Sequence, residues 1–427
     1  MTHRLPLGRA HLLAATILRD LRASHVDTTE IVPVGSLRRC APDVGDVALF
    51  ATARPSERER LLRAFTRLPA AAGVLAHSDD GATIATDRGE VTLHVAPPAQ
   101  AGAALVWLTG SIGHVHALAG VAETRGLRFA GGRLLDGVGE PVRCHNEESF
   151  YALLDLPFIP PEVRHGRDEV KAAREGRLRD LLTTFHIRGD LHMHSTWSDG
   201  RDTIEQMVRA SIALGYEYIA ITDHSQRAWS SRKLALEDVT DQRAEIELVR
   251  REFPGIRVLH GIEVDIMKDG TLDFEDEVLA GFDIVLASLH DHGGQQPQEL
   301  MERYLSAMAS PYVDVITHPA NRTPGVTSGY DLDFDRLFEA AVATGTAMEI
   351  DGAPGHLDMD GDVARRAAEA GVTIVVDSDC HRSEWLRRQM RFGVCTARRG
   401  WIEPRHVLNT RPVDAVVDFV ARQRSRA

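Results

Sequence analysis

The chain has 427 residues, of which 43% are hydrophobic and 26% are charged, and its formal net charge is −13 at pH 7. This composition is typical of a globular protein, and the length exceeds that of one ordinary domain. No apolar run reaches the roughly 18 residues that a membrane-spanning helix needs, so the sequence predicts no membrane association.

The N-terminal segment HLLAATIL, residues 11–18, runs directly into the charged stretch RDLRASH. We interpret it as part of an amphipathic helix and not as a signal peptide. The four cysteines show no CxxC spacing. The sequence therefore predicts neither a disulfide framework nor a zinc knuckle, and a reducing cytoplasm is the expected location.

Charge is unevenly divided along the chain. Residues 1–187 hold 22 basic and 22 acidic side chains, which leaves 27 basic and 40 acidic side chains for the remainder. An acidic half normally repels nucleic acid. Bound divalent cations would change this, because they are often the largest charges in a site. The alternative is that these acidic residues only cover solvated helices.

From residue 190 onward, short apolar runs alternate with amphipathic stretches. The expected strands are 190–195, 218–224, 256–266, 282–290, 313–319, 346–351 and 372–379. The expected helices between them include 203–215, 236–253 and 362–371. This alternation predicts a parallel sheet covered by helices. Seven strands favour a closed or nearly closed β/α barrel, with a doubly wound open sheet as the alternative.

Almost every expected strand ends in a histidine or a carboxylate. These residues are His192, His194, His224, Glu263, His290, His318, Asp379 and His381. Active sites of β/α barrels lie at this edge, and side chains two apart on a strand face the same way. Imidazoles and carboxylates are ligands of Zn, Mn and Fe, and burying so many of them without compensation is costly. The pattern therefore predicts a metal cluster.

Other polar residues nearby allow more than one interpretation. Asp199 lies in SDG and is either a ligand or part of an Asp-Gly turn, and His292 is a ligand, a supporting residue or a general acid. Cys380 lies between Asp379 and His381 and is expected to face away and pack. The histidines that we expect to be ordinary core or surface residues are His260, His356 and His406.

The motifs HxH, SDG, TDH, IE, LH, THP and SDCH, in this order, resemble the PHP (polymerase and histidinol phosphatase) domain. The segments RGDLHMHSTWSDG, AITDHS, GIEVDI and DSDCHRSEWLRRQMRFGVCTARRGWIEP are similar to the C-terminal PHP domain of bacterial family X DNA polymerases, PolX. The resemblance covers about residues 188–427, which we take as the second domain. It implies an α/β fold with a distorted seven-stranded barrel.

The same resemblance implies nine ligands for three divalent metal ions, which would be Mn, Zn or Fe. Carried over by position, the ligands are His192, His194, Asp199, His224, Glu263, His290, His318, Asp379 and His381. The first ion would take His192, His194, Glu263 and Asp379. Glu263 would bridge to a second ion at His290 and His318, and the third would take Asp199, His224 and His381.

Residues 1–187, the expected first domain, resemble the α+β nucleotidyltransferase palm and thumb of PolX more weakly. The similar segments are VGSLRRCAPDVGDVALF (34–50), WLTGSIGHVHAL (107–118) and LPFIPPEVRHGRDEV (156–170). A two-metal polymerase needs Asp-x-Asp and a third carboxylate. Here the pair reads Asp46-Val47-Ala48, and Thr92 occupies the third position. The resemblance therefore implies a degenerate palm that does not polymerise, and the family's N-terminal lyase and fingers region is also expected to be missing.

The expected reaction is phosphoester hydrolysis, because bound divalent metal activates water and neutralises phosphoryl charge. Resemblance to PolX implies a 3′–5′ exonuclease or other 3′-end processing in DNA repair. The alternatives are a phosphomonoesterase for a small metabolite, like histidinol-phosphate phosphatases, and a non-catalytic DNA-binding protein. We expect His192, His194, Glu263 and Asp379 to be catalytic, with Arg322 holding phosphate.

Several cations follow the expected strand ends and are candidate contacts for a DNA 3′ end. They are Arg227, Arg232 and Lys233 around Trp229, and Arg382 after His381. Cations beside an aromatic ring bind single strands by charge and stacking. A solvated loop with a packing tryptophan is the alternative, and the sequence does not specify an oligomeric state.

Overall fold

The structure is a computed structural model that describes residues 4–24, 31–228, 230–291 and 293–425. The chain forms two compact units, Met1–Arg179 and Asp180–Ala427. Residues 180–187 belong to the second unit, where Leu182 and Ile187 are buried in the core and the Leu182 amide donates to Ile402 O (2.8 Å). The boundary expected from the sequence, after residue 187, lies eight residues further along the chain.

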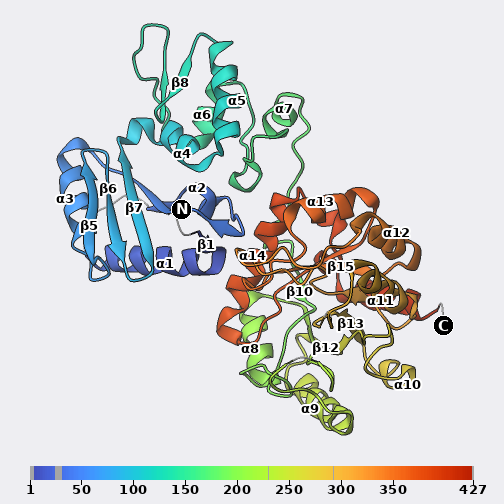
Figure 1. Ribbon diagram of the computed structural model, residues 1–427. Helices are drawn as coiled ribbons and strands as arrows, with labels where there is room; N and C mark the ends of the chain where they lie inside the picture. The colour runs from blue at the N-terminus through green and yellow to red at the C-terminus, as the bar shows by residue number, and fades with distance from the viewer. Residues whose placement is uncertain (1–3, 25–30, 229, 292, 426–427) are drawn as a thin grey trace. The chain divides into compact units, whose positions relative to one another are not determined.

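The N-terminal unit is built on a five-stranded mixed sheet in the order β2-β4-β7-β6-β5 (Figure 1). Its strands are β2 (Val32–Pro33), β4 (Val47–Thr52), β5 (Gly73–Ser78), β6 (Gly81–Thr86) and β7 (Gly89–Ala96), and the pair β1 (Leu5–Pro6) and β3 (Asp43–Val44) lies beside them. Helices α1 (Leu7–Ala23) and α3 (Pro55–Thr66) pack on the sheet. The expected N-terminal helix is therefore confirmed, and its buried positions recur at helical spacing.

The rest of the N-terminal unit is mainly helical. It contains α2 (Gly35–Arg38), α4 (Ala101–Thr109), α5 (Ile112–Glu123), α6 (Glu147–Leu153), α7 (Glu169–Arg174) and the hairpin of β8 (Arg128–Ala130) and β9 (Arg133–Leu135). Ala48 and Phe50 of β4 pack against Ala101 and Ala104 of α4. Ala48, at one of the positions where a polymerase would carry a carboxylate, is thus part of an apolar cluster.

The second unit contains seven parallel strands in sequential order, from β10 to β16. They are β10 (Gly189–Asp190), β11 (Tyr218–Ile221), β12 (Arg257–Asp265), β13 (Ile284–Ser288), β14 (Val315–Ile316), β15 (Ala347–Asp351) and β16 (Ile374–Asp377). A parallel bridge between Met193 and Cys380 joins the first strand to the last, so the sheet is a nearly closed barrel. Six of the seven strands lie within the segments expected from the sequence, whereas β10 begins one residue before its segment and overlaps it only at Asp190. The nearly closed barrel is confirmed.

Helices surround the barrel (Figure 1). They are α8 (Ile204–Leu214), α9 (Val239–Glu252), α10 (Asp276–Leu279), α11 (Pro297–Ala309), α12 (Phe334–Thr344), α13 (Gly361–Ala370), α14 (Leu386–Arg399) and α15 (Val413–Arg424). Glycines in the left-handed region end α8, α12 and α13, where an L side chain would be strained. None of the helices in the described ranges is long and apolar enough to cross a membrane.

Candidate metal centre

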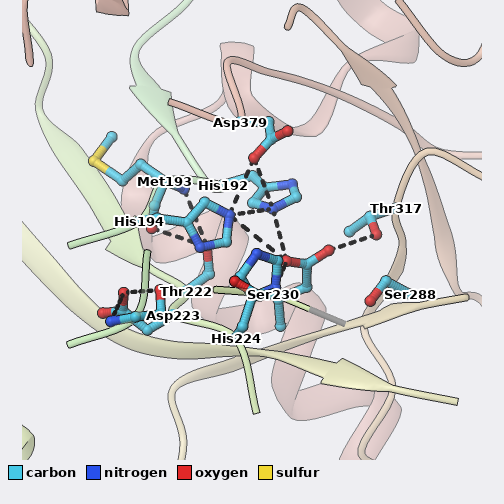
Figure 2. Close-up of polar contacts among 12 residues, drawn as sticks. His192, Met193, His194, Thr222, Asp223, His224, Ser230, Ser288, Thr317 and Asp379 are labelled. Atoms are coloured by element: carbon cyan, nitrogen blue, oxygen red, sulfur yellow. Dashed lines mark hydrogen bonds and ion pairs between the residues drawn. The ribbon is translucent and has the colours of Figure 1, made fainter. Parts of the chain in front are cut away.

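The two histidines after β10 point into the same buried space at the carboxyl end of the barrel. Both side chains are fully buried, and their Nε2 atoms lie 3.2 Å apart. Met193 between them points the other way, into the hydrophobic core (Figure 2). This is the alternation expected for successive residues of an extended chain. Cys380 also packs in this core, as the sequence predicted.

Asp379 joins these histidines from the last strand. Its Oδ1 lies 3.0 Å from His194 Nε2 and 3.6 Å from His192 Nε2 (Figure 2). Its backbone φ is +46°, and that of His318, after β14, is +25°. Side chains rarely adopt this region, and such strain concentrates where function requires a particular side-chain direction. Two of the expected ligands are thus held in strained conformations.

Glu263, at the carboxyl end of β12, is the centre of the cluster. Its carboxylate is fully buried, and its oxygens lie 2.8 Å from His224 Nδ1, 3.0 Å from His318 Nε2 and 3.4 Å from His290 Nε2. Burial alone raises the pKa of Glu263. The surrounding imidazoles outweigh that effect, and the pKa lies well below its ordinary value.

A second gathering of ligand atoms lies beside the first. Asp199 Oδ1 is 3.2 Å from His381 Nε2 and 3.5 Å from His224 Nε2, and the His194 ring stacks between the rings of His224 and His381 at 4.3 and 4.2 Å. Burial, together with the neighbouring His381 and His224, lowers the pKa of His194 to about 3. Imidazoles this close cannot all be cationic, but neutral imidazoles can share a metal centre.

The nine side chains expected from the PHP resemblance therefore meet in one region. Ligand atoms lie within 4.8 Å of one another in each of three groups: His194, Asp199, His224 and His381; His192, His194 and Glu263; His224, Glu263 and His290. His318 and Asp379 adjoin these groups through Glu263 and His194. The structure brings the expected set together, including Asp199, whose role the residue pattern had left open.

Unpartnered polar atoms test whether these side chains suit a metal. Buried atoms without a hydrogen bond in the described part of the chain include His194 Nδ1 and His318 Nδ1, whereas Asp199 Oδ1, His224 Nδ1 and Glu263 Oε2 make only the ion-pair contacts given above. Leaving buried polar atoms unsatisfied costs about 1–3 kcal/mol each. Divalent cations would satisfy lone pairs of this kind, so the donor set fits metal ions.

Three further carboxylates, which were not predicted from the sequence, orient the histidines or their loops. Glu349 in β15 accepts from His192 Nδ1 (2.6 Å) and from the His318 amide (2.8 Å). Asp265 lies 3.1 Å from His290 Nδ1, and Asp223 accepts from the backbone and side chain of Ser195. Carboxylates behind metal-binding histidines fix the tautomer and ring orientation. In the sequence these carboxylates lie in the strand-end motifs MEID, IEVD and TDH, which hold Glu349, Asp265 and Asp223.

The expected phosphate contact, Arg322, is already engaged. Its Nη1 donates to Asp360 Oδ2 (2.9 Å), and its side chain is 13% exposed. The Arg382 guanidinium lies over the Trp385 ring, 4.8 Å from the centroid.

The candidate DNA contacts that precede α9 interact with residues other than the nine expected ligands. Arg227 pairs with Asp273 (3.4 Å), Arg232 donates to Gly200 O (2.9 Å), and Lys233 is exposed. Trp229 and His292 lie outside the described residues.

The palm positions in the N-terminal unit carry no comparable cluster of carboxylates. Strands β4 and β7 are parallel, and their register pairs Ala48 with Thr92. Thr92 Oγ1 lies 3.0 Å from Thr83 Oγ1 of β6. The three polymerase positions thus combine Asp46 with a methyl group and a hydroxyl, and a single carboxylate is a poor magnesium site.

Comparisons with known proteins match each of the two units to a protein family. Residues 190–351 match the PHP domain family, and residues 104–165 match the DNA polymerase beta thumb family. The chain is 38% identical to "DNA polymerase/3'-5' exonuclease PolX" of Bacillus subtilis over 98% of this chain and 73% of the relative. This chain belongs to the bacterial PolX family.

Shorter relatives match the barrel unit. A "Probable phosphatase" of Caldanaerobacter subterraneus is 30% identical over 45% of this chain and 75% of the relative, and one of Syntrophotalea carbinolica is 26% identical over 56% and 98%. Together with the PHP domain, these relatives support a phosphoester hydrolase that depends on metal ions.

Proposed function

We propose that this PolX family member processes DNA 3′ ends, as a 3′–5′ exonuclease or 3′-phosphatase in DNA repair, with three divalent ions of Mn, Zn or Fe. The observation that carries the proposal is the convergence of nine side chains around the buried Glu263. The relative that spans nearly the whole chain has a 3′–5′ exonuclease in its name. The phosphatase relatives match only about half of the chain.

When bound, the ions supply activated water near neutral pH and neutralise charge on the phosphoryl oxygens. His192 and His194 would hold an ion with Glu263 and Asp379. Glu349 keeps His192 Nδ1 occupied, so the Nε2 atom faces the centre.

Arg322 would bind a non-bridging phosphate oxygen. Asp360 holds the guanidinium through Nη1, which leaves its other nitrogens for that contact. Arg382 and the cations Arg227, Arg232 and Lys233 would follow the strand beyond the reacting phosphate. Their charge would offset the acidic surroundings, together with the bound ions.

The activity test uses the full chain loaded with Mn²⁺ and a 3′-recessed oligonucleotide labelled at its 5′ end. We expect stepwise shortening of the labelled strand, loss of shortening with a chelator, and its return with Mn²⁺. His192→Ala should abolish it while leaving thermal unfolding of the N-terminal unit unchanged. An intact oligonucleotide in the presence of bound metal would rule out the nuclease.

The second candidate is a phosphomonoesterase for a small metabolite, which the phosphatase relatives favour. Release of phosphate from histidinol phosphate, with no shortening of DNA, would select it. A protein that binds DNA and metal but hydrolyses neither substrate would be the non-catalytic alternative.

We propose that the N-terminal unit, Met1–Arg179, no longer polymerises. The thumb match favours a contact with DNA, whereas the apolar cover over Ala48 favours a scaffold. A primer-extension assay on gapped DNA tests the proposed loss of synthesis. Nucleotide addition at a useful rate would contradict it.

A further inference from the structure

One strand of the barrel contributes none of the nine expected ligands. Six strands end in at least one of them, but β15 does not. Its carboxyl end nevertheless reaches the same mouth, because Asp351 follows Glu349 by two residues and is fully buried. His356, in the loop after β15, stacks on the His318 ring with centroids 5.1 Å apart. His356, expected from the sequence to be an ordinary core or surface residue, thus lies against one of the expected ligands.

Asp351 has a carboxylate oxygen without a protein partner. Its Oδ1 accepts from the Ala353 amide (2.5 Å), whereas its buried Oδ2 has no hydrogen bond from the described residues. Asp351 lies in the same group of ligand atoms as Asp379, and this buried oxygen is available to a cation.

Two neighbouring residues point to a cation. Ligand atoms of Asp351, His356 and Asp379 all lie within 4.8 Å of one another. His356 Nδ1 is buried and, within the described ranges, makes no hydrogen bond. A proton shared by the two carboxylates would leave this nitrogen unsatisfied. A cation would satisfy all three groups, and its charge would offset the repulsion between the carboxylates.

The backbone holds these residues in place without the ion. The Asp351 amide donates to Asp358 O (2.6 Å), and the Met359 amide donates to Glu349 O (3.0 Å), so the loop 352–358 closes back on β15. A Cβ at Gly352 would lie 2.2 Å from the backbone oxygen of Gln389 in α14. This close approach leaves no room for a side chain and seats the end of β15 against the helix.

We propose that Asp351, His356 and Asp379 hold a further divalent cation on the β15 side of the barrel mouth. Nitrogen and carboxylate donors suit Mn²⁺, Zn²⁺ or Fe²⁺. Asp379 bridges this cation to the three-ion centre of the proposed function, and only through this shared residue does the inference rest on that function.

The test counts metal ions in the full-length protein. Unaltered protein, Asp351→Asn and His356→Gln are loaded with Mn²⁺, freed of excess by gel filtration and analysed for metal per chain. Each variant should hold one ion fewer than the unaltered protein. The matched control for the carboxylate is Asp335→Asn on α12, where Asp335 pairs with Arg366. The matched control for the imidazole is His406→Gln. His406 precedes Val407, which forms a β-bridge with the first residue of β16 at the opposite end of the barrel. Both should keep the full number.

The outcomes separate the two proposals. If both variants hold as many ions as the unaltered protein, the additional site is wrong and the three-ion centre stands. If the unaltered protein holds no ions, both proposals fail. His356→Gln removes no buried charge, so a loss of one ion by this variant, with unchanged thermal unfolding, supports the site even if Asp351→Asn does not fold.

Discussion

The N-terminal unit and the barrel unit both align parallel strands, but they place different chemistry at the strand ends. In the N-terminal unit, the register of β4 and β7 sets Ala48 beside Thr92, and Ala48 packs in an apolar cluster with α4. In the barrel, the register of seven strands gathers imidazoles and carboxylates around Glu263. Strand alignment is common to both, so the side chains at the aligned positions decide whether a metal centre exists.

The largest expected effect is at Glu263. Replacing it with glutamine removes the charge that faces three imidazoles, and activity on a labelled 3′ end should fall on the order of 10³-fold. Bound metal, measured by elemental analysis, should fall as well. The exposed Glu217→Gln is the matched control and should retain both. Full metal content and activity in Glu263→Gln would show that the charge of Glu263 is not what distinguishes the barrel unit from the N-terminal unit.

A smaller loss is expected when the support behind a ligand is removed. Glu349→Gln should keep a hydrogen bond to His192 but lose its charge, and metal affinity should fall roughly 10–100-fold. Titration with Mn²⁺ followed by activity would show a shifted midpoint, with the maximal rate largely recovered at saturation. A lowered maximal rate with an unshifted midpoint would contradict a positioning role.

Arg322 tests whether substrate contacts lie beside the metal ligands. Truncation to alanine removes a charged hydrogen bond to phosphate, and kcat/KM should fall about 10-fold, with the metal count unchanged. The control Arg336→Ala breaks an exposed pair with Glu302 and should have no effect. An unchanged kcat/KM in Arg322→Ala would limit this arginine to its pair with Asp360.

The smallest effect is expected in the palm. Asp46→Ala should change 3′-end processing and metal content by less than about twofold, because a substitution outside the active centre perturbs little. The same assay and elemental analysis measure this. Loss of metal in Asp46→Ala would mean that the palm still holds an ion, and would remove the distinction between the two units.

Periodicity was sufficient to predict the barrel, because buried parallel strands are continuous apolar runs between amphipathic helices. Strand length was less predictable. β10 and β14 each pair over only two residues, since the chain turns away where His192 and His318 enter the mouth. The positive φ of His318 is a tertiary effect without a local signal.

The nine side chains of the cluster were predictable from motifs, whereas the pairing of the supporting carboxylates with individual histidines was not. Glu349 contacts His192 across 157 positions of sequence, and only the closure of the barrel brings them together. The position of His356 was not predictable for the same reason. Its position over His318 depends on a loop that folds back on β15, and no pattern in GAPGHLDM indicates that path.

The strained backbone at His318 and Asp379 has a consequence for local stability. Each such residue costs on the order of 1–3 kcal/mol, which bound ions would offset by holding the side chains. With ions removed, amide exchange should accelerate first at these two strand ends and leave the palm sheet unaffected. The protein would then loosen at the mouth long before the barrel as a whole unfolds.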